Sequence, residues 1–235
     1  MPSAVSSEPS AQPAAPAAAL HQVDKAYGHG PGRTQVLAGF SLAVPRAAVT
    51  LIAGPSGCGK STALRLLAGV DIPDRGTVVI AGTVLSGLRP AARRRIRAAQ
   101  VSYLFQDPVA NLVEDLTVLE QVTFAARLRG VDRRVEVLHR MLGDLDLDQL
   151  ADRYPRQLSG GQQQRAAIAA ATIGCPALIV ADEPTAELDA SNGATVLALL
   201  RDLALGGRAV VLASHDPAAR PIADVVCDMS PGKST

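Results

Sequence analysis

Residues 54–61 read GPSGCGKS, a glycine-rich run that ends in a lysine and a hydroxyl residue. The spacing is glycine, four residues, glycine, lysine and serine, which lets successive backbone N–H groups converge on phosphate oxygens. In such a loop Lys60 reaches the β- and γ-phosphates, and the hydroxyl of Ser61 ligates Mg²⁺. The pattern therefore predicts a site for a nucleoside triphosphate and Mg²⁺. The residues expected to contact the nucleotide in this loop are Gly54, Pro55, Ser56, Gly57, Cys58, Gly59, Lys60, Ser61 and Thr62.

Two carboxylates follow one another at the end of the apolar run ALIVAD, residues 177–182. An acidic side chain at the end of a buried strand is costly unless it is paired or bound to a metal. We therefore expect Asp182 to hold Mg²⁺ through water, and Glu183 to polarise the attacking water as a general base. His215 follows another apolar run, residues 208–214. Because the carboxyl ends of parallel strands gather at one edge of a sheet, we expect His215 beside Asp182.

Two more side chains are candidates for the same site. Gln106 follows a strand-like run and is a neutral group that can accept from water and contact Mg²⁺ without adding charge. Tyr27 offers an aromatic face on which adenine could stack, with simple packing as the alternative. Cys58 lies inside the glycine loop, where positive potential lowers thiol pKa values, but a small residue tolerated in a tight turn is the better explanation, and we predict no redox role.

The elements that must position these residues alternate between strand and helix. Residues 48–53, 177–182 and 208–214 are short apolar runs typical of buried strands. A helical pattern at 62–70 follows the first run, and another at 190–207 ends in two glycines. Strands that alternate with helices predict a parallel sheet covered on both faces.

Two other regions differ from this pattern. Residues 36–44 and 76–85 contain turn glycines and short apolar runs, and they predict a smaller antiparallel β region. Residues 110–174 place apolar side chains three and four apart, for example Val135 and Leu138, and they predict an inserted helical subdomain. The expected fold class is thus α/β, a mostly parallel sheet with these two additions.

Composition limits the possible partners. The chain has 235 residues, of which 48% are hydrophobic, and its 23 basic and 22 acidic residues leave a formal net charge of +1. No overall positive field favours nucleic acid or an anionic membrane as the main partner. The three cysteines are odd in number and scattered, which suits a reducing compartment better than a disulfide framework.

The chain is predicted to hold one domain. Residues 1–19 are rich in Ala, Pro and Ser without Lys or Arg, so we expect a disordered N-terminal extension instead of a signal peptide. The single domain is expected to cover residues 20–235. No apolar run approaches the roughly 18 to 20 residues that cross a bilayer, so we expect the chain to be soluble by itself.

In their order along the chain, these motifs resemble the ATP-binding-cassette (ABC) ATPases. The phosphate loop alone would specify only a P-loop NTPase, whereas LSGGQQQR is far more specific. The resemblance extends from about residue 20 onward. It is carried by GPSGCGKST as the Walker A motif, FQDP as the Q-loop, LSGGQQQR as the signature, ALIVADEP as the Walker B strand with its glutamate, AELD as the D-loop and ASHDP as the switch histidine.

The resemblance implies that the signature motif acts on a nucleotide held by another subunit. Two cassettes associate head to tail, and each ATP lies between the Walker A motif of one and the signature of the other. Ser159, Gly160 and Gly161 would then sense the γ-phosphate through a hydroxyl and a helix N-terminus, which is a ready site for an anion, and Gln162 would continue the helix toward the sheet domain and the ribose edge. Asp189 of the D-loop belongs to the same implied nucleotide site.

The implied function is an ATPase subunit that binds ATP and Mg²⁺, pairs with a second copy or a paralogous ATPase, and drives a separate transmembrane permease. We expect it at the cytoplasmic face of the membrane, as a peripheral subunit. The sequence is most similar to the macrolide-exporter and lipoprotein-releasing ATPases, which extrude substrates or perform mechanical work. Alternatives are a transmembrane signalling ATPase of the cell-division type and an importer ATPase.

Overall fold

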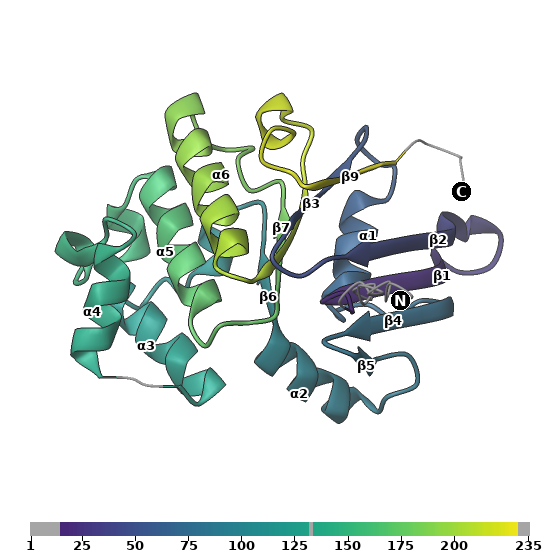
Figure 1. Cartoon of the computed structure of the whole chain (residues 1–235), viewed down its shortest axis with the longest axis horizontal. Coiled ribbons are helices and arrows are strands. Elements are labelled where there is room, and N and C mark those ends of the chain that lie inside the picture. The colour runs from purple at the N-terminus through teal and green to yellow at the C-terminus, as the bar shows by residue number, and fades with distance from the viewer. Residues whose placement is uncertain (1–14, 132–133, 230–235) are drawn as a thin grey trace, which may run out of the picture.

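The computed structural model describes residues 15–131 and 134–229. Two sheets lie side by side, and helices flank them (Figure 1). The strands are β1 (Ala18–Tyr27), β2 (Thr34–Val44), β3 (Val49–Ala53), β4 (Arg75–Ile80), β5 (Thr83–Val84), β6 (Val101–Leu104), β7 (Leu178–Asp182), β8 (Ala209–Ala213) and β9 (Val225–Asp228). The α-helices are α1 (Lys60–Leu67), α2 (Pro90–Gln100), α3 (Val118–Arg129), α4 (Val135–Gly143), α5 (Gly160–Thr172) and α6 (Ala190–Leu205).

The larger sheet is parallel, as predicted, with the strand order β6-β7-β8-β3-β9. Its central strands β3, β7 and β8 are buried and mostly apolar on both faces, because each face is covered. One core cluster joins Ile52 of β3 to the buried residues of α1, and the other joins Leu51 of the same strand to α5 and α6. Successive side chains of a strand point to opposite faces, so α1 lies on one side of the sheet and α5 and α6 on the other (Figure 1).

The smaller sheet is antiparallel, with the order β2-β1-β4-β5. It begins earlier than we expected. Ala17, Ala18 and Ala19 are fully buried, and Ala17 donates a backbone hydrogen bond to Val44 and accepts one from Ala81. Small side chains pack in this core as well as larger ones would, so the domain boundary lies before Ala17 and not at residue 20. The rest of the predicted disordered extension, residues 1–14, lies outside the described residues.

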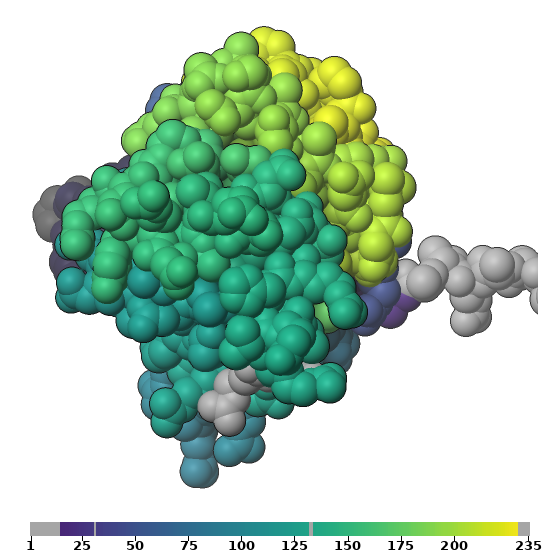
Figure 2. Space-filling model, turned by 90° about the vertical axis from the view of Figure 1, so that its left-hand side faces the viewer, coloured from purple at the N-terminus to yellow at the C-terminus, as the bar shows by residue number. Residues whose placement is uncertain are grey.

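The helices α3, α4 and α5 follow one another between β6 and β7, where the sequence predicted an insertion. Figure 2 faces this helical region, which fills much of the view in teal and green. Thr117 caps α3, and its reciprocal bonds with Glu120 form a capping box that fixes where the helix begins. Among the described helices, none combines the length and apolar character needed to cross a membrane.

Candidate functional site

A pocket of about 350 Å³ opens where the predicted motifs meet. The loop between β3 and α1 forms one side of it, and the segments that follow β6, β7 and β8 form the other. This arrangement arises because the three strands are parallel, so their carboxyl ends share one edge. The lining residues are Val36, Ser56, Gly57, Gly59, Lys60, Ser61, Thr62, Gln106, Asp182, Glu183 and His215.

The phosphate loop is held tightly against the sheet. Gly59 caps α1 with a φ of 102°, a left-handed conformation that glycine adopts without strain. A Cβ on Gly54 would lie 2.3 Å from the backbone oxygen of Met229 and 2.8 Å from the Cys58 sulfur, so only glycine fits there. Gly54, Pro55 and Cys58 are predicted contacts that do not line the pocket. They form the wall behind it.

Lys60 is nearly buried, and its ammonium points into the loop. Its Nζ donates to the carbonyl oxygens of Gly54 at 2.9 Å and Pro55 at 3.1 Å. The same atom lies 3.9 Å from Glu183 Oε1. The ammonium is thus fixed between the loop and the carboxylate, where it can bind a phosphate oxygen without a large rearrangement.

Glu183 and His215 form a pair at the edge of the sheet. Nδ1 of His215 lies 2.9 Å from Oε2 of Glu183, whose side chain is 14% exposed. We expected His215 beside Asp182; the structure brings both into one pocket, but the hydrogen bond joins His215 to Glu183. Glu183 has a φ of 46°, which is strained for a residue other than glycine and is held by its backbone bond to Ala213. A carboxylate fixed in this way, beside an imidazole, is placed to take a proton from water.

The residues predicted for magnesium fit a hard cation. The Ser61 hydroxyl donates to Oδ1 of Asp182 at 3.1 Å, and Gln106 lines the same pocket. A hydroxyl, a carboxylate and an amide supply the oxygen ligands that Mg²⁺ prefers, and the ion usually completes its shell with waters and substrate phosphates. Ser61, Asp182 and Gln106 would hold it here.

The signature motif lies at the N-terminus of α5, outside the pocket of its own chain. Ser159 caps the helix: its backbone N–H donates to Oε1 of Gln162 at 2.9 Å, and its Oγ accepts from the Gln162 backbone at 3.4 Å. Ser159 and Gly160 are exposed, so the helix N-terminus faces outward. An exposed helix start with unpaired N–H groups can bind an anion presented from outside the chain.

Asp189 also lies away from the pocket lining, at the start of α6. Its Oδ1 accepts from the backbone N–H groups of Ser191 and Asn192, and its Oδ2 accepts from the Asn192 side chain at 2.6 Å. The backbone bond from Asn192 and the side-chain bonds from Ser191 and Asn192 lower the pKa of Asp189 to about 2. The carboxylate is therefore a helix cap, and its link to bound nucleotide stays a prediction.

Asn192 connects this cap to the signature motif, and our sequence reasoning missed it. A Cβ on Gly161 would lie 2.2 Å from Oδ1 and 3.1 Å from Cβ of Asn192, so the helix α5 approaches α6 as closely as a glycine allows. The sequence contained a signal for the cap at Asp189 but none for Asn192, because a helix cap bonds the backbone of the third residue whatever its side chain. The pattern did not indicate which element the asparagine would touch.

We predict that Gly161→Ala will lower the free energy of unfolding by about 1 to 3 kcal/mol, because Asn192 must move and lose its bond to Asp189. Urea unfolding measures the change. Gly160→Ala is the matched control, since its Cβ would meet only Leu188 at an ordinary 3.5 Å. The double variant Gly161→Ala, Asn192→Ala should be less destabilised than the sum of its single changes. Full additivity would contradict the contact.

Tyr27 lies beside the phosphate loop but does not line its pocket. Its hydroxyl donates to Oδ2 of Asp71 at 2.7 Å, and its side chain remains partly exposed. Burial and then Asp71 raise the pKa of Tyr27, while a hydrogen bond with Thr62 lowers it. The Tyr27 hydroxyl thus lies near the first turn of α1, and adenine stacking stays a prediction.

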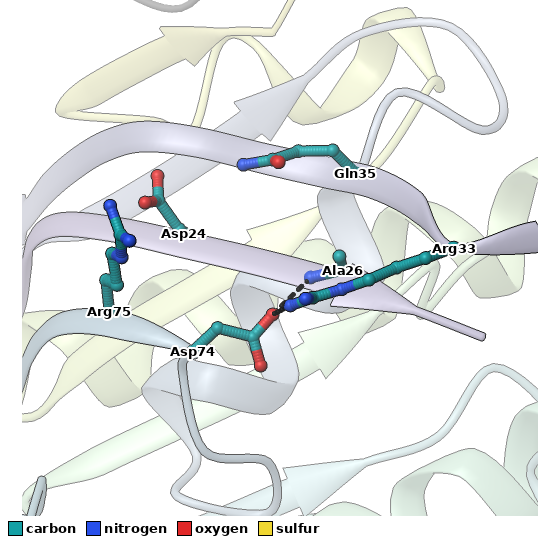
Figure 3. A pocket seen from close by; sticks show the side chains of 6 residues that line it. All are labelled: Asp24, Ala26, Arg33, Gln35, Asp74 and Arg75. Carbon is teal, nitrogen blue, oxygen red and sulfur yellow. Dashed lines mark hydrogen bonds and ion pairs between the residues drawn. The ribbon is translucent and has the colours of Figure 1, made fainter. Parts of the chain in front are cut away.

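A larger pocket, of about 530 Å³, lies on the antiparallel sheet (Figure 3). It contains none of the residues predicted for the nucleotide. Its charged groups are largely satisfied within the chain: Oδ2 of Asp74 accepts from Arg33 at 2.9 Å and from the Ala26 backbone at 2.8 Å, and Asp24 accepts from the Gly39 backbone. We assign the chemistry to the smaller pocket, because a cation, two carboxylates, an imidazole and an amide line the same open space there.

The chain is similar to proteins already described. The model of the family described as ABC transporter matches residues 37–186. The chain is 38% identical to the lipoprotein-releasing system ATP-binding protein LolD of Shewanella frigidimarina, over 84% of this chain and 83% of that protein. It is 37% identical to the macrolide export ATP-binding/permease protein MacB 1 of Aeromonas hydrophila, over 91% of this chain and 33% of that protein.

A further sequence relative and a solved structure are also similar to the chain. An uncharacterized ABC transporter ATP-binding protein of Mycobacterium bovis is 38% identical over 88% of this chain, which spans 63% of that relative's length. The dimeric structure of MJ0796, a bacterial ABC transporter cassette, superposes with a TM-score of 0.82 at 32% identity, covering 92% of this chain and 95% of that one. The predicted fold class is confirmed, and the chain belongs to the ABC transporter family.

Proposed function

We propose that this chain is the subunit of an ABC transporter that binds and hydrolyses ATP. One observation carries the proposal: a single pocket gathers the phosphate loop with Gln106, Asp182, Glu183 and His215. A phosphate-binding loop alone is consistent with nucleotide binding without hydrolysis. The addition of a fixed carboxylate, an imidazole and oxygen ligands for Mg²⁺ supports hydrolysis.

The proposed reaction is attack of water on the γ-phosphate. Glu183 orients the water and takes its proton, and His215 holds the Glu183 carboxylate in place through its Nδ1. Lys60 binds the β- and γ-phosphate oxygens and offsets their charge. Bound Mg²⁺ would neutralise charge that develops on the phosphates, while Ser61, Asp182 and Gln106 keep it beside the loop.

A single chain leaves this site open on one side, and we propose that a second copy or a paralogous ATPase closes it. Ser159 and the N-terminus of α5 do not line the pocket of their own chain and face outward. The structural relative described as a dimeric ABC transporter cassette supports pairing of two chains. Each ATP would lie between the phosphate loop of one chain and Ser159 of the partner subunit.

Ser159→Ala tests this arrangement. We expect nucleotide binding by the monomer to stay within about twofold of the parent, because Ser159 lies outside that pocket. ATP-dependent dimerisation should weaken by about fivefold or more, since a hydroxyl that binds the γ-phosphate is lost at each of two sites. Fluorescent nucleotide titration and light scattering measure the two steps. Equal loss of both steps would argue against a role across the subunit interface.

We further propose that the ATPase acts on a separate transmembrane permease, at the cytoplasmic face of the membrane. The names of two relatives support an association with a permease: one is the ATP-binding protein of a lipoprotein-releasing system, and the other is a macrolide export ATP-binding/permease protein. Both names favour an exporter or a system that performs mechanical work.

A further inference from the structure

Tyr103 touches the proposed magnesium site from the side opposite the phosphate loop. It lies on β6, where it pairs with Val180 of β7, so its side chain is on the same face as Val180 and Asp182. The Tyr103 hydroxyl donates to Oδ2 of Asp182 at 3.2 Å. The Ser61 hydroxyl donates to Oδ1 of the same carboxylate at 3.1 Å. Each of the two oxygens of Asp182 therefore accepts from a different hydroxyl.

The Tyr103 ring is itself fixed. It lies against the ring of Phe105, with 4.9 Å between the centroids, and Val101 and Leu104 on the same short strand are buried. A tyrosine hydroxyl keeps its proton at physiological pH, so Tyr103 acts as the donor to the carboxylate.

The orientation of the Asp182 carboxylate determines whether one of its oxygens faces the Ser61 hydroxyl. The carboxylate of an aspartate can rotate about its Cβ–Cγ bond, and terminal torsion angles of this kind are broadly distributed. A hydroxyl on Oδ2 restricts that rotation and leaves Oδ1 directed to Ser61. Without it, Asp182 would sample orientations in which neither oxygen faces the loop.

We propose that Tyr103 is a positioning residue for magnesium, which keeps the Asp182 carboxylate turned toward Ser61 before ATP and the ion arrive. The inference rests on the proposed function, because it concerns the ion that accompanies ATP. Tyr103 would contact neither the ion nor the nucleotide. Its effect should therefore appear in the concentration of Mg²⁺ that is needed, and it should not appear in nucleotide binding without the ion.

The test uses Tyr103→Phe, which removes the hydroxyl and keeps the ring. Both this variant and its parent carry Glu183→Gln, so that ATP is not consumed. A fluorescent ATP analogue is titrated at a series of Mg²⁺ concentrations and again in EDTA. We expect Tyr103→Phe to need about three- to tenfold more Mg²⁺ for half-maximal binding, which corresponds to the net contribution of one ordinary hydrogen bond. Affinity in EDTA should be unchanged.

Two further measurements separate an effect on the magnesium site from a general effect of removing a phenol hydroxyl. Tyr154→Phe, which removes a phenol hydroxyl from a residue that does not line the pocket, should leave the Mg²⁺ requirement unchanged. The increase in melting temperature on adding Mg²⁺ with ATP, measured for each protein from its own value without ligand, should be smaller for Tyr103→Phe than for its parent.

An unchanged Mg²⁺ requirement in Tyr103→Phe would overturn the inference alone. Equal weakening of binding with Mg²⁺ and in EDTA would also overturn it, because that result would mean a general packing role. Failure of the parent to bind nucleotide under either condition would overturn the proposed function, and the inference with it.

Discussion

Glu183→Gln is expected to lower the rate of ATP hydrolysis by about two to four orders of magnitude while leaving ATP binding intact. Glutamine has nearly the same size and keeps the packing at this position, but its amide cannot take a proton from water. The carboxylate lies beside His215 at 2.9 Å and is only 14% exposed, so a solvent water molecule does not easily replace it. Phosphate release measured at saturating ATP and Mg²⁺ gives the rate.

The same substitution should make the ATP-bound dimer persist. If the γ-phosphate joins two chains, a chain that cannot remove it stays paired, and light scattering should show a stable dimer with ATP and a monomer with ADP. Glu187→Gln is the matched control, since it removes an exposed carboxylate four residues further on. Normal hydrolysis by Glu183→Gln would show that the proton acceptor is another group.

The trapped protein also provides the means to test the permease. Tagged Glu183→Gln protein, captured in mild detergent with ATP and Mg²⁺, should bring down a polytopic membrane protein. Recovery of ribosomes or of soluble proteins alone would mean that the cassette is correct and the transport proposal is wrong.

Lys60→Ala is expected to weaken ATP binding by about a hundredfold or more. The ammonium is placed to make two or more charge-assisted hydrogen bonds to phosphate oxygens, each worth about 1.5 to 3 kcal/mol. In the structure these donors are directed to Gly54 and Pro55 and lie near Glu183. Alanine removes every donor and leaves the phosphates facing the Glu183 carboxylate without a cation between them.

Equilibrium titration with a fluorescent ATP analogue measures the loss. Arg94→Ala removes an exposed cation from α2 and should leave the affinity unchanged, which separates a local effect from a change in net charge. Circular dichroism should show the same fold in both variants. If Lys60→Ala bound ATP as the parent does, the loop would not be the phosphate site.

The sequence allowed most of the parallel sheet and the pocket to be predicted. Runs such as residues 177–182 are apolar throughout and end in charged residues, so both the strand and the edge at which it ends could be recognised. The geometry of parallel strands then placed Gln106, Asp182 and His215 together without further information.

Contacts between side chains from different elements could not be predicted in this way. Tyr103 sits in an ordinary strand pattern, and nothing in that pattern indicates that its hydroxyl reaches Asp182 on the next strand. Ala17, Ala18 and Ala19 continue an alanine- and proline-rich composition, yet they are buried because β1 lies between two neighbours. In each case tertiary packing, which composition does not encode, decided the outcome.

The close fit of Gly161 against Asn192 also bears on how this chain can diverge. An alanine at position 161 is a single-step change that helix propensity alone would favour. Its cost falls in a chain where residue 192 is smaller, and such a chain has lost one of the bonds that hold Asp189. The two positions are therefore expected to be coupled, so the signature glycine is constrained by its own scaffold as well as by any nucleotide.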